Sequence, residues 1–171
     1  MNEQYRVAQK LGLMFQADTP LPDDIKAWAI SQLKAKSPAL GISRLGAKVK
    51  PWPKSLQPDL MERDTMFANW FQRNKIGDAA NASNAERQAN QKENLMREKD
   101  QLKFSHRNVY GKDQVRLRFA SFWANHFTTG DVHDNQNHIG HAIDEAILAN
   151  LNGDFSRMLY KVTSHPAMLI Y

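Results

Sequence analysis

Apolar residues recur at helical spacing along most of the chain. In the segment 23–35, Ile25, Trp28, Ala29 and Leu33 fall on one face if the segment is helical. The same period predicts helices over 3–15, 23–35, 58–77, 82–104, 112–127, 136–150 and 154–164, with a last helical turn beginning at Pro166. No segment alternates apolar and polar residues as a half-buried strand does. The pattern therefore predicts an all-α fold, an irregular multi-helix bundle.

The segment 112–127 has the strongest apolar pattern and is predicted to form the central helix. Its apolar stripe consists of Val115, Phe119, Phe122, Trp123 and Phe127. Smaller apolar residues at 117, 120 and 124 widen that stripe. We expect the final helices to pack against this segment.

Two segments depart from the helical pattern within what we expect to be a single domain, 1–171. Residues 37–58 contain four prolines and two glycines, which predicts a long basic loop. Residues 78–105 are rich in charged and amide side chains, with only Leu95 and Leu102 as a thin apolar seam. This second segment is expected to be a polar exposed helix or a partly disordered connector.

Composition excludes several kinds of protein. The chain has 171 residues and no cysteine, so disulfides, thiolate metal sites and a cysteine nucleophile are all excluded. No apolar run is long enough for a transmembrane helix. The N-terminal segment lacks the continuous apolar stretch of a signal peptide, which favours a cytoplasmic protein.

The last residues, HPAMLIY, form an apolar run with no polar tail. Natural termini are usually polar and frayed, so we expect the chain to be a domain cut from a longer protein or a truncated one. An apolar end of this kind can also mediate binding to a partner protein or self-association through residues 166–171.

The net charge of +5 is concentrated in the first part of the chain. The densest stretch, Lys34–Lys54, has six basic residues and no acidic one. Such a stretch attracts phosphate backbones or anionic surfaces. No nucleic-acid-binding motif accompanies it, so a solvated basic loop is favoured over nucleic-acid binding.

Five of the six histidines lie in the last third of the chain. His138 and His141 are three residues apart, and Glu145 follows one helical turn later. Imidazole and carboxylate ligands at this spacing can hold zinc or iron. The alternative is a polar surface segment, since neither HExxH nor a paired ExxH is present. No cofactor is predicted, and a divalent metal stays the open alternative.

His126 lies beside the aromatic stripe of the predicted central helix. Two roles fit this position: a structural one, in which the ring donates to a backbone carbonyl, and a catalytic one at the mouth of a pocket. Asn125 is interpreted as a polar residue at the end of that helix, facing the following loop. It is also a candidate site residue because of its place beside His126.

Several phrases together resemble a known family. FWANHF at 122–127, preceded by Arg-Leu, matches the phrase "RL..FW.NHF" of the bacterial domain-of-unknown-function family 1800. EAI at 145–147, Gly153, Phe155, Leu159 and HPAML at 165–169 match its later phrase "EAIRPH..G.F..LL......HPAML.YLDN". KLGLMF and WAISQL resemble its N-terminal segments more loosely. One departure is that Leu148, Ala149 and Asn150 stand where the family often has Arg-Pro-His.

The resemblance implies a mainly helical bacterial protein with no established reaction. It also implies that the chain is the N-terminal part of a longer protein, because HPAMLIY stops before the family's Leu-Asp-Asn. Relatives with export signals give a periplasmic location as the alternative to a cytoplasmic one. Three hypotheses about function follow. The first is a structural or interaction module of a larger protein. The second is a fragment of a hydrolase-like, possibly metal-assisted enzyme that uses His126 and His165. The third is binding of an anionic polymer through Lys34–Lys54.

Overall fold

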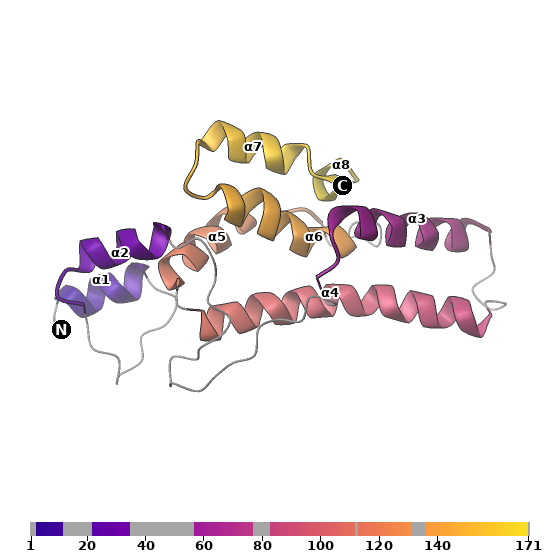
Figure 1. Cartoon of the computed structure of the whole chain (residues 1–171), viewed down its shortest axis with the longest axis horizontal. Coiled ribbons are helices and arrows are strands. Elements are labelled where there is room, and N and C mark those ends of the chain that lie inside the picture. The colour runs from indigo at the N-terminus through magenta and orange to yellow at the C-terminus, as the bar shows by residue number, and fades with distance from the viewer. Residues whose placement is uncertain are drawn as a thin grey trace.

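All regular secondary structure in the described part of the chain is helical (Figure 1). A computed structural model describes residues 3–11, 22–34, 57–76, 83–111, 113–130 and 136–170. Within these ranges no strand is present, which confirms the all-α prediction. The predicted loop 37–58 lies outside the described residues except at its end, and so does nearly all of the basic stretch. None of the described helices is both long and apolar enough to cross a membrane.

The helices follow the predicted segments closely. Their bounds are α1 Glu3–Leu11, α2 Ile25–Lys34, α3 Leu60–Ile76, α4 Asn84–Tyr110, α5 Gln114–His126, α6 Gln136–Ala142, α7 Phe155–Thr163 and α8 Pro166–Leu169. The predicted helix 136–150 changes its winding halfway: after α6 come a π-helical segment, Ile143–Ile147, and a 3-10 turn, Leu148–Asn150. The polar segment 78–105 is helical from residue 84.

Local side-chain bonds explain where helices begin. Asp59 and Glu62 form a reciprocal capping box at α3, with each side chain accepting from the other's backbone N–H at 2.9 and 2.8 Å. Asp24 accepts from the N–H of Ala27 at the start of α2. Pro166 occupies the first position of α8, as predicted from its place after His165.

The helices are arranged around α6 and the π-helical segment (Figure 1). The long helices α3 and α4 run side by side at one end of the molecule, and α1 and α2 pair at the other end beside α5. α6 packs against α4, α3 and α8, while α7 packs on the π-helical segment. The predicted central helix, α5, also contacts that segment.

The hydrophobic core is formed by α5, the π-helical and 3-10 segments, and α7. Its fully buried residues are Leu117, Ala120, Ala146, Ile147, Leu148, Met158 and Val162. Trp123, Ala124 and Phe127 pack against them and are partly buried. The core therefore uses the positions that were expected only to widen the stripe.

The predicted buried face of the central helix is partly wrong. Phe119 is 41% exposed and Phe122 is 59% exposed, whereas Leu117 and Ala120 are fully buried. The buried side of α5 follows the spacing 117, 120, 124 and 127, which is as regular as the aromatic spacing. Small side chains let α5 approach its neighbours closely, so the core takes that side and the large rings stay at the surface.

The polar helix α4 is a second correction. Leu102, expected in its apolar seam, is 59% exposed. The buried stripe of α4 instead contains Met96, Asp100, Lys103 and Arg107, spaced four, three and four residues apart. A helix expected to be exposed therefore buries three charged side chains.

Arg116 joins distant parts of the fold. Its guanidinium is buried and donates to the carbonyl oxygens of Leu33, at the end of α2, and Leu148, in the 3-10 turn. These carbonyls lie where helices end, and the Leu33 carbonyl also accepts from the side-chain amide of Asn152, at 2.5 Å. Burial lowers the pKa of Arg116 from its ordinary value, with the Asp113 carboxylate acting in the opposite direction.

Gly140 permits the close contact between α6 and α4. A Cβ added at this position would lie 2.5 Å from the Cβ of Asp100 and closer still to its carboxyl group. Because the carboxyl group of Asp100 is held by other residues, it cannot move aside cheaply.

We expect Gly140→Ala to lower the free energy of unfolding by about 1–3 kcal/mol through overpacking. Chemical denaturation measures this loss. Gly153→Ala is the matched control, since a Cβ there would meet only the Asn150 carbonyl, at 3.5 Å. Equal stability of the two variants would contradict the role given to Gly140.

Candidate functional site

A network of buried charges connects α3, α4 and the π-helical segment. The guanidinium of Arg63 forms a two-pronged pair with Asp100, at 2.6 and 3.1 Å. Asp144 accepts from both Lys103 and Arg107, each at 2.5 Å. Lys103 also lies 3.7 Å from Asp100 and so joins the two pairs. We call these five residues the ionic network.

The ionic network is well shielded from water. The side chain of Arg63 is 1% exposed and that of Asp100 is 5% exposed. Arg63 also donates to the backbone carbonyls of Pro58 and Asn137, so its charge is spread over several acceptors. The ionic network contains three cations and two carboxylates, which leaves an excess positive charge inside the protein.

A pair of histidines lies on the other side of α6. Nδ1 of His141 is 3.0 Å from Nε2 of His165. Nδ1 of His165 accepts from the backbone N–H of Ala167, at 3.1 Å, and thereby caps α8. Because that nitrogen is an acceptor, the proton of neutral His165 is on Nε2 and is donated to His141. The proton of His141 is then on its own Nε2.

Both imidazoles of this pair are held in the neutral form. Burial lowers the pKa of His165 to about 4, and repulsion from the protonated form of His141 and from Arg63 acts in the same direction. Burial, followed by the positive charge of Arg63, also lowers the pKa of His141. A second proton on His165 would place an N–H against the N–H of Ala167 and remove the cap.

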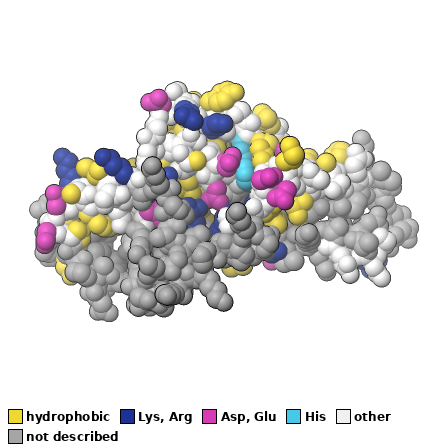
Figure 2. Space-filling view, viewed as in Figure 1, with side chains coloured by type: hydrophobic (Ala, Val, Ile, Leu, Met, Phe, Trp, Pro, Cys, Tyr) yellow, Lys and Arg dark blue, Asp and Glu magenta, His cyan; other side chains and the backbone are white. Residues whose placement is uncertain are grey.

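His138 is fully buried and contacts α3. Its Nε2 lies 2.7 Å from Oδ1 of Asp64, and its ring packs edge-on against Phe67. On the face in Figure 2, histidine is visible between acidic side chains, where α6, α8 and the start of α3 come together. His138 and the His141–His165 pair thus form two separate contacts of α6, the first with α3 and the second with the start of α8.

His126 is in a different environment from His165. Its side chain is exposed, and its ring stacks nearly parallel to Phe122, with centroids 6.3 Å apart. It also contacts Trp123 and Phe127 edge-on. His165 pairs with His141 and not with His126. Asn125, which precedes His126 on α5, is also exposed.

The predicted metal ligands do not converge among the described residues. His138 faces Asp64, His141 faces His165, and Glu145 is exposed. In the described ranges no three histidine or carboxylate side chains form a group able to hold a metal ion. The only ring nitrogen of His165 that faces His141 carries the proton of the pair, so it offers no lone pair to a metal.

Rings on α5 and α7 that reach the surface form what we call the aromatic patch. Its exposed members are Phe119, Phe122, His126 and Phe155, and the partly buried Trp123 contacts three of them. Phe155 is 51% exposed, and its ring centroid lies 5.3 Å from that of Trp123, which joins the two helices. Leu159, one turn after Phe155 on α7, is 38% exposed.

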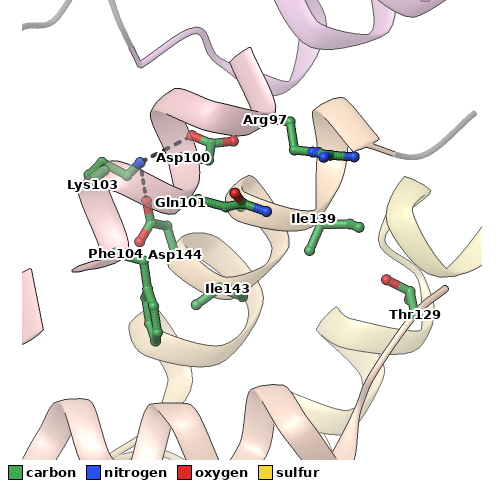
Figure 3. Close-up of a pocket in the computed structure, with 10 residues that line it drawn as sticks. Arg97, Asp100, Gln101, Lys103, Phe104, Thr129, Ile139, Ile143 and Asp144 are labelled. Atoms are coloured by element: carbon green, nitrogen blue, oxygen red, sulfur yellow. Dashed lines mark ion pairs between the residues drawn. The ribbon is translucent and has the colours of Figure 1, made fainter. Parts of the chain in front are cut away.

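A cavity of about 270 Å³ lies between α4 and α6 (Figure 3). Asp100, Lys103 and Asp144 of the ionic network form part of its wall. Arg97, Gln101, Phe104, Thr129, Ile139, Gly140 and Ile143 form the rest. The cavity is therefore lined by both charged and apolar side chains.

Sequence reasoning missed the ionic network. The signal was present, because Asp100, Lys103 and Arg107 follow a helical stripe through Met96, an apolar residue. A stripe of charges is usually a solvated face, and only the partners on α3 and in the π-helical segment distinguish this one. Asp144 and Arg63 are far away in sequence.

Comparison with known proteins identifies the family. The family model described as "Protein of unknown function (DUF1800)" matches residues 8–171, so the chain belongs to this family, as the sequence phrases indicated. No curated protein matches the chain, and neither does any solved structure.

Asp100→Asn is expected to lower the free energy of unfolding by about 3–5 kcal/mol, because Arg63 would stay buried without a counter-charge. Chemical denaturation of this variant is the measurement. Asp154→Asn is the matched control, since Asp154 is exposed and makes no side-chain capping bond. A loss below about 1 kcal/mol for Asp100→Asn would contradict the buried pair.

Stability should fall as the pH drops from about 6.5 to about 4. The pKa of His165 is lower in the folded protein than in the unfolded chain, so the unfolded chain takes up the proton first and acid favours unfolding. Across this pH range, the protonation of His165 is expected to lower the free energy of unfolding by about 3 kcal/mol. His165→Asn keeps an acceptor for the Ala167 N–H and should remove most of this loss.

Thermal unfolding at a series of pH values measures the effect. His126→Asn is the matched control, because that side chain is exposed, and it should keep the pH dependence of the natural sequence. An unchanged pH profile in His165→Asn would contradict the neutral histidine pair.

Proposed function

We propose that the chain is a non-catalytic interaction module of a larger protein, and that its aromatic patch binds an amphipathic helix of a partner. The observation that carries this proposal is the exposure of Phe122 and Phe155, two large rings on neighbouring helices. Contiguous apolar surface of this kind is rare in proteins that bind nothing there.

The shape of the aromatic patch favours a helical partner. Phe119, Phe122 and His126 are spaced three and four residues apart, so they form a ridge along α5, and Phe155 adds a second wall from α7. A partner helix with apolar residues at the same spacing can pack against such a ridge. α7, which carries Phe155, also exposes Arg157 and Lys161, and these cations favour an acidic partner because opposite charges steer association.

The residues of the family phrases also support a structural role. Arg116 binds two backbone carbonyls, Leu117 and Ile147 lie in the core, and His165 caps α8. Each of these contacts stabilises the fold without leaving a reactive group exposed.

The hydrolase-like alternative draws less support from the geometry. His165 is buried and bonded to backbone, while His126 is at the surface among aromatic rings. A general base needs an unprotonated nitrogen that a substrate can reach. His126 and His165 do not lie together at a place where one substrate could reach both rings. A catalytic role for His126, His165 and Asn125 stays a prediction, as does polymer binding through Lys34–Lys54.

Binding of a fluorescent, acidic amphipathic helical peptide tests the interaction module. The unmodified chain should bind it saturably, and the double variant Phe122→Ser/Phe155→Ser should bind at least tenfold more weakly, because two large apolar contacts are lost. Tyr160→Ser is the matched control, an exposed ring on α7 outside the aromatic patch, and it should bind normally. Thermal unfolding should be nearly unchanged in all three proteins.

Two outcomes would contradict this function. One is equal peptide binding by the double variant and the unmodified chain. The other is sedimentation showing a dimer that the double variant loses, which would make a second copy of this chain the occupant of the aromatic patch.

A further inference from the structure

The charges that line the cavity between α4 and α6 cancel one another. Its charged lining residues are two cations, Arg97 and Lys103, and two carboxylates, Asp100 and Asp144. The other two cations of the ionic network are not among the lining residues. An ionised ligand would lose its hydration without meeting an excess of opposite charge, so the cavity favours an uncharged ligand.

These charged side chains are also held by other groups of the protein. Lys103 lies 2.5 Å from Asp144 and 3.7 Å from Asp100. Asp100 pairs with Arg63 at 2.6 Å, and Arg97 has a partner of its own as well. A ligand that bound one of these charges would have to compete with the existing partner. The lining groups that a ligand can use are therefore the uncharged ones.

Gln101 is the uncharged polar group of the α4 wall. Its side chain is exposed, and in Figure 3 it extends toward Ile139 on α6. Among the described residues it forms no side-chain hydrogen bond. A primary amide both donates and accepts, so it can pair with a hydroxyl or with another amide. A polar head group bound to Gln101 lies at the solvent side of the cavity.

The rest of the uncharged lining is mainly apolar and extends toward a second cavity. Phe104, Ile139 and Ile143 line the first cavity and are each partly buried. Water beside these side chains has few hydrogen-bond partners, so an apolar group replaces it favourably. The second cavity, of about 120 Å³, shares Thr129, Ile139 and Ile143 with the first, and these residues form the wall between the two.

We infer that the cavity binds an uncharged amphiphile, an unbranched aliphatic chain that carries one hydroxyl or carboxamide head group. The head group exchanges hydrogen bonds with Gln101, and the chain lies against Phe104, Ile139 and Ile143. The volume of about 270 Å³ suits a chain of medium length, since a cavity of roughly 150 Å³ already holds benzene. No residue of the aromatic patch lines this cavity, so the site is independent of the partner surface proposed above.

Calorimetric titration of the purified chain with 1-octanol tests the inference. 1-Octanol should bind saturably at one site, about tenfold or more tightly than octanoate, which has the same chain length and a charged head group. It should bind about fifteenfold more tightly than 1-hexanol, because each buried methylene contributes roughly fourfold in affinity. An octanoate affinity equal to or above that of 1-octanol, or 1-octanol binding that does not saturate, would overturn the inference.

A substitution at Gln101 tests the position of the head group. Gln101→Leu should weaken 1-octanol binding about fivefold through loss of a hydrogen bond. Gln88→Leu is the matched control, at an exposed glutamine of the same helix that does not line the cavity, and it should bind as the unmodified chain does. Equal binding by these two variants would overturn the role of Gln101.

A substitution in the shared wall tests the position of the chain. Ile139→Ala should join the two cavities, so the affinity ratio of 1-decanol to 1-octanol should rise about tenfold as two more methylenes become buried. Ile30→Ala, at a position 41% exposed on α2, is the matched control and should leave this ratio unchanged. Thermal unfolding shows that both variants are folded. The same ratio in both variants would contradict the binding of the chain along this wall.

The Phe122→Ser/Phe155→Ser variant separates the cavity from the aromatic patch. It should bind 1-octanol as tightly as the unmodified chain, even though it loses the helical peptide. Loss of 1-octanol binding in this variant would show adsorption to the aromatic patch and would overturn the cavity site.

Discussion

The pair between Arg63 and Asp100 is made where water hardly reaches, and much of the fold depends on it. A charge moved into the protein interior loses its hydration, so each member of the ionic network must find a partner within the protein. These partners come from α3, α4 and the π-helical segment, which therefore must pack together. Gly140 makes this possible, because α6 can approach the carboxyl group of Asp100 only without a side chain there.

The ionic network also positions the surfaces that carry the proposed functions. Asp144 belongs to the π-helical segment. The last two residues of that segment, Ala146 and Ile147, pack in the hydrophobic core with residues of α5 and α7. α5 then has two different sides: one faces the core, and the other exposes Phe119, Phe122 and His126 of the aromatic patch. The same packing that buries the small side chains of α5 keeps its large rings accessible.

Much of the local structure could be predicted from the sequence. Among the described residues, apolar periodicity located seven α-helices and Pro166 located the eighth, because helix formation depends on neighbours three and four residues apart. The start at Pro166 and the capping box at Asp59 use residues within three positions of each other. The family followed from FWANHF and HPAML, short phrases that a sequence displays directly.

Periodicity could not determine which side of an amphipathic helix is buried. In α5 the aromatic stripe and the small-residue stripe are equally regular, and only the close approach of neighbouring helices selects Leu117 over Phe122. In α4 a charged stripe is buried because partners more than thirty residues away neutralise it. His165 meets His141, 24 residues before it, because α8 packs against α6. The sequence by itself determined the helices and their caps, which arise from local contacts. Tertiary packing decided the buried charges, the histidine pair, the cavity and the aromatic patch, since each depends on residues that folding alone brings together.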